Sequence, residues 1–162
     1  MGPRVAVSDD VLVRVAEAAE LTYRGDKHRA RTLFLEIWDE VGAERDALYR
    51  CAVAHGLADA QADARAELAW DLRALNAASE LTDARATEVG MPPPAAMLAS
   101  LHLNLGDIYL RLGDPASAHR HADAGLAAAD SLPDDGYGAT IRRELDGLKE
   151  RLTDDQVRSR HP

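Results

Sequence analysis

The chain has 162 residues, a formal charge of −9 and only seven aromatic side chains, whereas alanine and leucine are abundant. Its length suits one domain or a short repeat array, and its composition favours helices over strands. The charge argues against nucleic acid as a partner, no apolar run approaches the roughly 20 residues of a membrane span, and the single cysteine excludes an internal disulfide. We therefore expect an acidic, all-α, cytoplasmic protein that binds neither nucleic acid nor membrane.

The first predicted helical hairpin covers about residues 10–42. Ser8 followed by two aspartates predicts a helix start, because a side-chain cap and carboxylates suit the positive end of the helix dipole. Apolar residues then recur at helical spacing up to a break at Gly25-Asp26. A second helix follows and stops at Gly42.

Two further hairpins and a last helix are predicted downstream. The second hairpin, about residues 44–90, ends at Gly90 and three prolines, which remove three backbone donors. The third covers about 95–132. A capping helix is predicted over about 138–152, followed by a polar, frayed tail over 153–162.

Small residues recur along the chain with a helix-turn-helix period. Three pairs lie 34 residues apart: Ala18 and Ala52, Ala30 and Ala64, and Phe34 and Leu68. The pair Gly25-Asp26 before Ala30 also matches Gly113-Asp114 before Ala118. Small side chains at fixed positions let two helices approach closely, and the neighbouring hairpin buries the remaining apolar face.

In its later part the chain resembles the tetratricopeptide repeat family. The residues that carry the resemblance are Leu105-Gly106, Tyr109, Leu112-Gly113-Asp114 and Ala118. The resemblance extends over about residues 10–133. It implies an α-α superhelix of about three hairpins plus a C-terminal capping helix, in one domain over residues 1–152.

The resemblance also implies a binding surface lined by the first helix of each hairpin. The candidate groove residues are Val15, Ala19, Tyr23, Tyr49, Arg50, Val53, Leu103, Asn104, Asp107 and Arg111. No lysine lies among them, so acidic chaperone tails are not the expected ligand, and a helix or an uncharged peptide fits better. The implied function is a non-catalytic protein-interaction or scaffold module. Simple packing of these residues between hairpins and homodimerisation through apolar surface remain alternatives.

The competing hypothesis is an enzyme or a ligand-responsive regulator with an enclosed small-molecule pocket. A closed cavity lined by His102, Asp107 and Tyr109 would favour it, whereas an open trough would favour the scaffold.

Metal and catalytic sites are not expected. His119 and His121 are roughly 200° apart around a helix axis and cannot chelate one ion together. The chain also contains one histidine and four carboxylate residues spaced four apart, which would lie along one face of a continuous helix: His55, Asp59, Asp63, Glu67 and Asp71. Such a row could offer oxygen ligands to a divalent cation. We expect instead that the first helix of the second hairpin ends near Gly56, which turns His55 to the core and leaves a solvated acidic face.

Cys51 lies on an apolar helix face, away from any predicted helix N-terminus, and is expected to be a buried structural thiol. Trp38 and Trp70 lie 32 residues apart on second helices, which indicates packing between helices rather than a platform for bases. The sequence thus predicts no cofactor, no metal and no catalytic residue.

Overall fold

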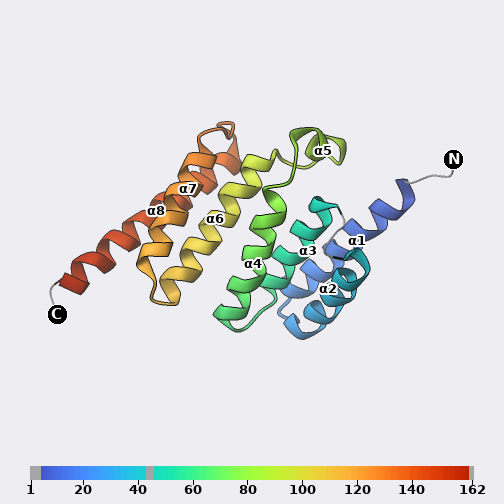
Figure 1. Cartoon of the computed structure of the whole chain (residues 1–162), viewed down its shortest axis with the longest axis horizontal. Coiled ribbons are helices and arrows are strands. Elements are labelled where there is room, and N and C mark those ends of the chain that lie inside the picture. The colour runs from blue at the N-terminus through green and yellow to red at the C-terminus, as the bar shows by residue number, and fades with distance from the viewer. Residues whose placement is uncertain (1–4, 43–45, 161–162) are drawn as a thin grey trace. The chain divides into compact units, whose positions relative to one another are not determined.

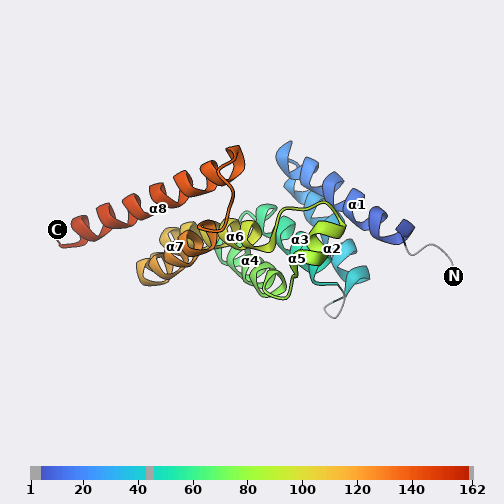
Figure 2. The same cartoon turned by 90° about the horizontal axis from the view of Figure 1, so that it is seen from above.

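A computed structural model describes residues 5–42 and 46–160, with side chains from residue 10 onward. Within these ranges the chain forms eight helices and no strand, so the predicted all-α class is confirmed (Figures 1 and 2). The helices are α1 (Val5–Tyr23), α2 (Lys27–Val41), α3 (Ala47–Asp59), α4 (Ala64–Ala78), α5 (Asp83–Glu88), α6 (Pro94–Arg111), α7 (Pro115–Ala129) and α8 (Gly136–Arg160).

Several boundaries differ from the sequence-based expectations. Helix α1 begins at Val5, three residues before the start predicted at Ser8. The side chain of Ser8 lies outside the described residues. The predicted start of the second hairpin, at residue 44, also lies outside them. Helix α8 continues to Arg160, so the predicted frayed tail is helical from 153 to 160. The short α5 was not predicted.

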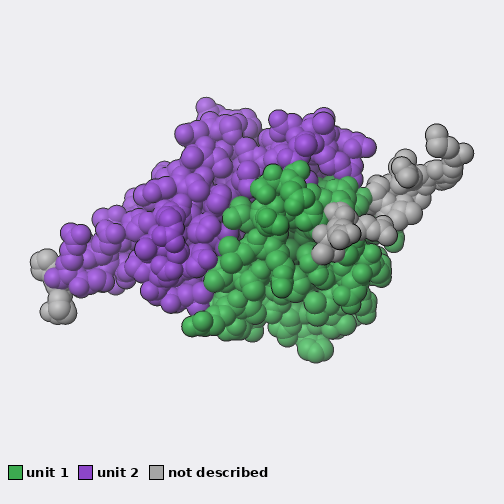
Figure 3. All heavy atoms as spheres, in the orientation of Figure 1, with its two compact units in different colours: residues 1–80 green, residues 81–162 purple. Residues whose placement is uncertain are grey.

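The chain divides into two compact units, residues 1–80 and 81–162, where the sequence predicted one domain over 1–152 (Figure 3). The physical basis of the division is that the apolar residues form two separate clusters, one in each unit. Each unit is described by itself below.

Unit 1 contains the hairpins α1–α2 and α3–α4, with α3 also packed against α1 and α2. Its core is built around Phe34, Ile37 and Leu57, all without solvent exposure. The chain can pack α3 closely against α2 because Gly56 lies on the Phe34 ring: a Cβ at Gly56 would come within 2.3 Å of that ring.

Unit 2 contains α5, the hairpin α6–α7 and the long α8, which packs against both α6 and α7 (Figures 1 and 2). Leu145, Leu148 and Leu152 of α8 are fully buried and cover the hairpin. Gly106 of α6 and Gly125 of α7 make room for them, since a Cβ at either glycine would lie 2.6 Å from a leucine methyl group of α8.

The same turn closes the first and third hairpins, as the matching Gly-Asp pairs predict. Gly25 and Gly113 adopt left-handed φ angles of +88° and +79°, which glycine tolerates without strain. The aspartate that follows each glycine donates its N–H to a carbonyl five residues earlier, at 2.9 Å in both cases. Its carboxylate then caps the next helix by accepting the N–H three residues on.

The second hairpin departs from this pattern. Four residues, 60–63, separate α3 from α4, whereas three separate the helices of the other two hairpins. The 34-residue spacing therefore does not identify the residues most deeply packed between α3 and α4. Ala52, Ala64 and Leu68, which the spacing singles out, are half-buried, whereas Ala54 is fully buried.

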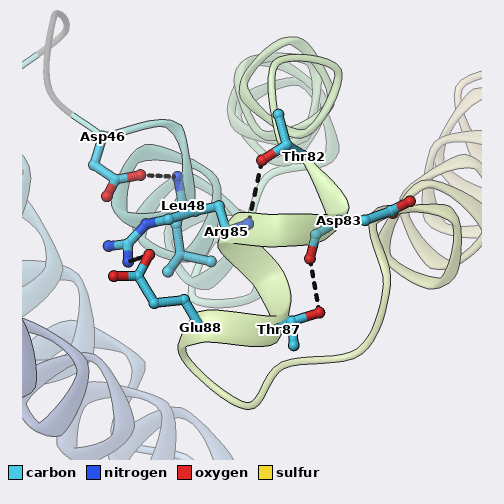
Figure 4. Close-up of polar contacts among 7 residues, drawn as sticks. All are labelled: Asp46, Leu48, Thr82, Asp83, Arg85, Thr87 and Glu88. Atoms are coloured by element: carbon cyan, nitrogen blue, oxygen red, sulfur yellow. Dashed lines mark hydrogen bonds and ion pairs between the residues drawn. The ribbon is translucent and has the colours of Figure 1, made fainter.

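Side-chain caps also begin α3 and α5 (Figure 4). The Asp46 carboxylate accepts the Leu48 N–H at 3.0 Å, and the Thr82 hydroxyl accepts the Arg85 N–H at 3.2 Å. Each cap pairs one of the N–H groups that a helix start leaves without an intrahelical acceptor.

Candidate functional site

A groove with a volume of about 430 Å³ lies in unit 2 between α6 and α8. We call it the α6–α8 groove. Helical spacing places three residues of each helix on the face that lines it: Leu103, Asn104 and Asp107 from α6, and Glu144, Gly147 and Arg151 from α8. Three of the four α6 residues predicted from the sequence thus lie together in one depression.

Asp107 is the electrostatic centre of the groove. Its carboxylate accepts hydrogen bonds from Arg111 Nε at 2.9 Å and from an Arg151 guanidinium nitrogen at 2.8 Å. Partial burial raises the pKa of Asp107, but the two guanidinium groups outweigh burial and hold that pKa below its usual value. The fourth predicted residue, Arg111, therefore supports the groove by orienting Asp107.

Two features leave the groove open for a ligand. The half-buried Asn104 amide makes no side-chain hydrogen bond to any described residue, although it can donate and accept at once. A Cβ at Gly147 would meet nothing within 4 Å. The groove therefore combines an apolar floor at Leu103, a free primary amide and space above a glycine.

The six candidates of unit 1 do not form one surface. Val53 is fully buried in the core, so its prediction as a groove residue is wrong, because it faces α1 and α2 rather than solvent. Val15 also packs against this core. Ala19 and Tyr23 are exposed, Tyr23 to 89%.

Tyr49 packs against the core of unit 1, and Arg50 forms an ion pair with Glu80 at 2.6 Å. Arg50 also lines a second cavity of about 360 Å³ with residues that the sequence did not single out together: Trp38, Leu72, Arg73 and Asn76. The indole of Trp38 meets that of Trp70 edge to face at 5.3 Å, which confirms packing between second helices.

Helix α3 continues through Gly56 to Asp59, so His55 and Asp59 lie on α3, whereas Glu67 and Asp71 lie on α4. The Nδ1 atom of His55 lies 3.2 Å from the Asp71 carboxylate of α4, and its Nε2 lies 3.6 Å from Asp59. Asp71 is only 1% exposed, so the predicted solvated face is wrong at this position. Burial lowers the pKa of His55, but the hydrogen bond to Asp71 and the charges of Asp59 and Asp71 raise it overall.

Cys51 is buried, as predicted. Burial, assisted by the Asp71 charge and opposed by Arg50, raises the pKa of its thiol to about 12. A thiol with such a pKa is a poor nucleophile near neutral pH.

The residues named for an enclosed pocket divide between two places in unit 2. Asp107 lines the α6–α8 groove, whereas His102 lies with its Nδ1 2.9 Å from Nδ1 of His121, and Tyr109 stacks on the His121 ring at 5.3 Å. In the part of the chain that the structure describes, no group of three or more His, Cys, Asp or Glu side chains is arranged to hold a metal ion.

The half of the groove that α8 contributes was not predicted from the sequence. Glu144, Gly147 and Arg151 recur at steps of three and four on a predicted capping helix, and that spacing was a usable signal. The resemblance implies a surface lined by the first helices of hairpins, whereas this groove also includes residues of α8.

Comparisons with known proteins find no matching family model, no matching curated protein and no matching solved structure. None of the described helices is long and apolar enough to cross a bilayer.

Proposed function

We propose that the protein is a non-catalytic interaction module of the cytoplasm, built from tetratricopeptide-like hairpins, that binds a helix or a peptide segment in the α6–α8 groove. The observation that carries the proposal is the open depression of about 430 Å³ that unites predicted residues of α6 with α8. Hydrophobic grooves on helical proteins commonly bind such segments.

The chemistry of the groove indicates what kind of segment fits. An apolar or small side chain fits against Leu103 and above Gly147, where no neighbouring atom intrudes. The Asn104 amide can pair with a main-chain amide group or with a polar side chain of the partner. Asp107 is already held by two guanidinium groups, so the groove wall is preorganised and little side-chain entropy is lost on binding.

The test uses the purified chain as bait in an extract of its native host. Gly147→Leu adds a side chain on the groove face, where its Cβ would meet no atom within 4 Å, and Asn104→Ala removes the Asn104 amide. We expect one stoichiometric partner for the wild type, with capture reduced about tenfold or more by either variant.

Asp146→Leu is the matched control, because it adds the same side chain to the neighbouring, exposed position of α8, which does not line the groove. Capture of the same partner by all variants at wild-type level would rule out the α6–α8 groove as the binding site.

A further inference from the structure

The second cavity, of about 360 Å³, lies within unit 1 and takes no part in the proposed function of the α6–α8 groove. We call it the Trp38 pocket. Its lining residues come from three helices: Trp38 from α2, Arg50 from α3, and Leu72, Arg73 and Asn76 from α4. Four of the five belong to second helices of hairpins, so the pocket is not the surface of first helices that the resemblance implies.

The Arg73 guanidinium is positioned to bind an anion. Its central carbon lies 4.4 Å from the centre of the Trp70 ring, so the face of an indole supports it. Trp70 in turn meets Trp38 edge to face at 5.3 Å and packs against the core of unit 1. No described side chain or carbonyl accepts a hydrogen bond from the Arg73 guanidinium. A planar guanidinium supported in this way can donate two parallel hydrogen bonds to one carboxylate.

The pocket is a locally positive place in an acidic chain. Two guanidinium groups line it, and no carboxylate is among its lining residues. Arg50 forms an ion pair with Glu80 at 2.6 Å, so the two arginines and this glutamate still carry a net positive charge. The chain as a whole carries −9, which disfavours the approach of acidic ligands elsewhere.

The remaining lining residues suit an apolar side chain and a main-chain group. Leu72 is 39% exposed, and the Trp38 indole is half-buried. The exposed Asn76 amide makes no side-chain hydrogen bond to any described residue and can both donate and accept. Because Leu72, Arg73 and Asn76 are all exposed, the pocket is open, whereas sites for small molecules bury most of the ligand. Recognition of a peptide segment by its side chains fits this geometry better.

We propose that the Trp38 pocket binds an acidic segment of a partner protein in which the carboxylate of an aspartate or glutamate lies next to an apolar side chain. The carboxylate accepts hydrogen bonds from Arg73, and the charge of Arg50 adds to the attraction. The apolar side chain packs against Trp38 and Leu72, and the Asn76 amide pairs with the main chain of the segment.

The test follows the indole N–H signals of the isotope-labelled full chain by nuclear magnetic resonance. The chain has two tryptophans, so Trp38→Phe assigns both signals. The probe is the peptide acetyl-Gly-Glu-Leu-Gly-amide, and acetyl-Gly-Gln-Leu-Gly-amide is its uncharged counterpart. We expect the glutamate peptide to shift the Trp38 signal and to bind about fivefold more tightly, or more, than the glutamine peptide.

Arg73→Gln should lower the affinity for the glutamate peptide about fivefold or more and leave that for the glutamine peptide unchanged. Arg65→Gln is the matched control, because Arg65 is exposed on the same helix and does not line the pocket. Glu80→Gln should tighten binding of the glutamate peptide, since it removes the carboxylate that competes for Arg50. Such a gain in affinity does not arise from unfolding.

Equal affinity for the two peptides, or an equal loss of affinity in Arg65→Gln and Arg73→Gln, would overturn the proposal. Binding of isocaproate, a free acid with a branched apolar end, as tightly as the glutamate peptide would also overturn it, because the pocket would then be a site for small acids. The side-chain amide signal of Asn104 in unit 2 reports separately on the α6–α8 groove, so failure at one site is distinguishable from failure at the other.

Discussion

At the scale of single residues, the second hairpin contains a buried polar contact between its two helices. His55 of α3 and Asp71 of α4 meet at 3.2 Å, and the second carboxylate oxygen of Asp71 is buried without a hydrogen-bond partner in the described structure. A buried carboxylate is costly unless a positive charge accompanies it. The protonated form of His55 supplies that charge.

This pair predicts a dependence of stability on pH. The folded-state pKa of His55 is raised above its unfolded value of about 6.5, so its contribution is fully present below pH 6.5 and is lost as pH rises through the folded pKa. We expect the stability of the wild type relative to His55→Gln to fall as the pH rises from about 6.5 through the raised folded-state pKa of His55. Urea unfolding across this range measures the difference, and a difference that grows with pH would contradict the assignment.

At the scale of helices, glycines decide how closely neighbouring elements approach. Gly56 lies within α3 against the Phe34 ring, whereas Gly147 lies within α8 with open space around it. The two positions therefore separate the packing role of a glycine from its low helix propensity.

We expect Gly56→Ala to destabilise the protein by about 1–3 kcal/mol, because the clash with Phe34 exceeds the gain in helix propensity. Gly147→Ala is its matched counterpart and should stabilise by about 0.5–1 kcal/mol. Denaturant unfolding of both variants checks the prediction. Equal effects of the same sign would mean that the Phe34 ring moves aside freely.

The helices that the sequence predicted best are those whose ends carry their own signals. The Gly25-Asp26 and Gly113-Asp114 turns lie where predicted, because a left-handed glycine and an aspartate cap are local features. The turn at 60–63 lacks the glycine and is one residue longer than the other two turns, so the 34-residue spacing does not hold there.

Features that depend on tertiary contact were not predictable in this way. The burial of Val53, the partners of His55 and the contribution of α8 to the groove all follow from which faces meet, and periodicity alone does not specify that. For the same reason, only the α6 half of the groove was found from the sequence.

At the scale of the whole molecule, each unit has an apolar core of its own. Both tryptophans, Trp38 and Trp70, belong to unit 1, so their fluorescence reports on that unit, whereas circular dichroism reports on helices of both. The two signals can therefore be followed separately during unfolding.

We expect Leu145→Ala to destabilise unit 2 by about 2–5 kcal/mol, because this side chain is fully buried in its core. Thermal melts should show a larger drop in the midpoint by circular dichroism than by tryptophan fluorescence. Ile37→Ala is the reciprocal variant in unit 1 and should lower the fluorescence midpoint. Identical shifts in both signals would show instead that the chain unfolds in one cooperative step.

The Gly-Asp turn bears on how a chain of this kind can change its length. The hydrogen bonds that close this turn join residues at most five positions apart. The turn therefore does not depend on contacts with a neighbouring hairpin. A gene segment that encodes one such hairpin can be duplicated and still encode a complete turn. The new copy then has to satisfy a single further condition, which is to cover the apolar face that the previous hairpin leaves exposed.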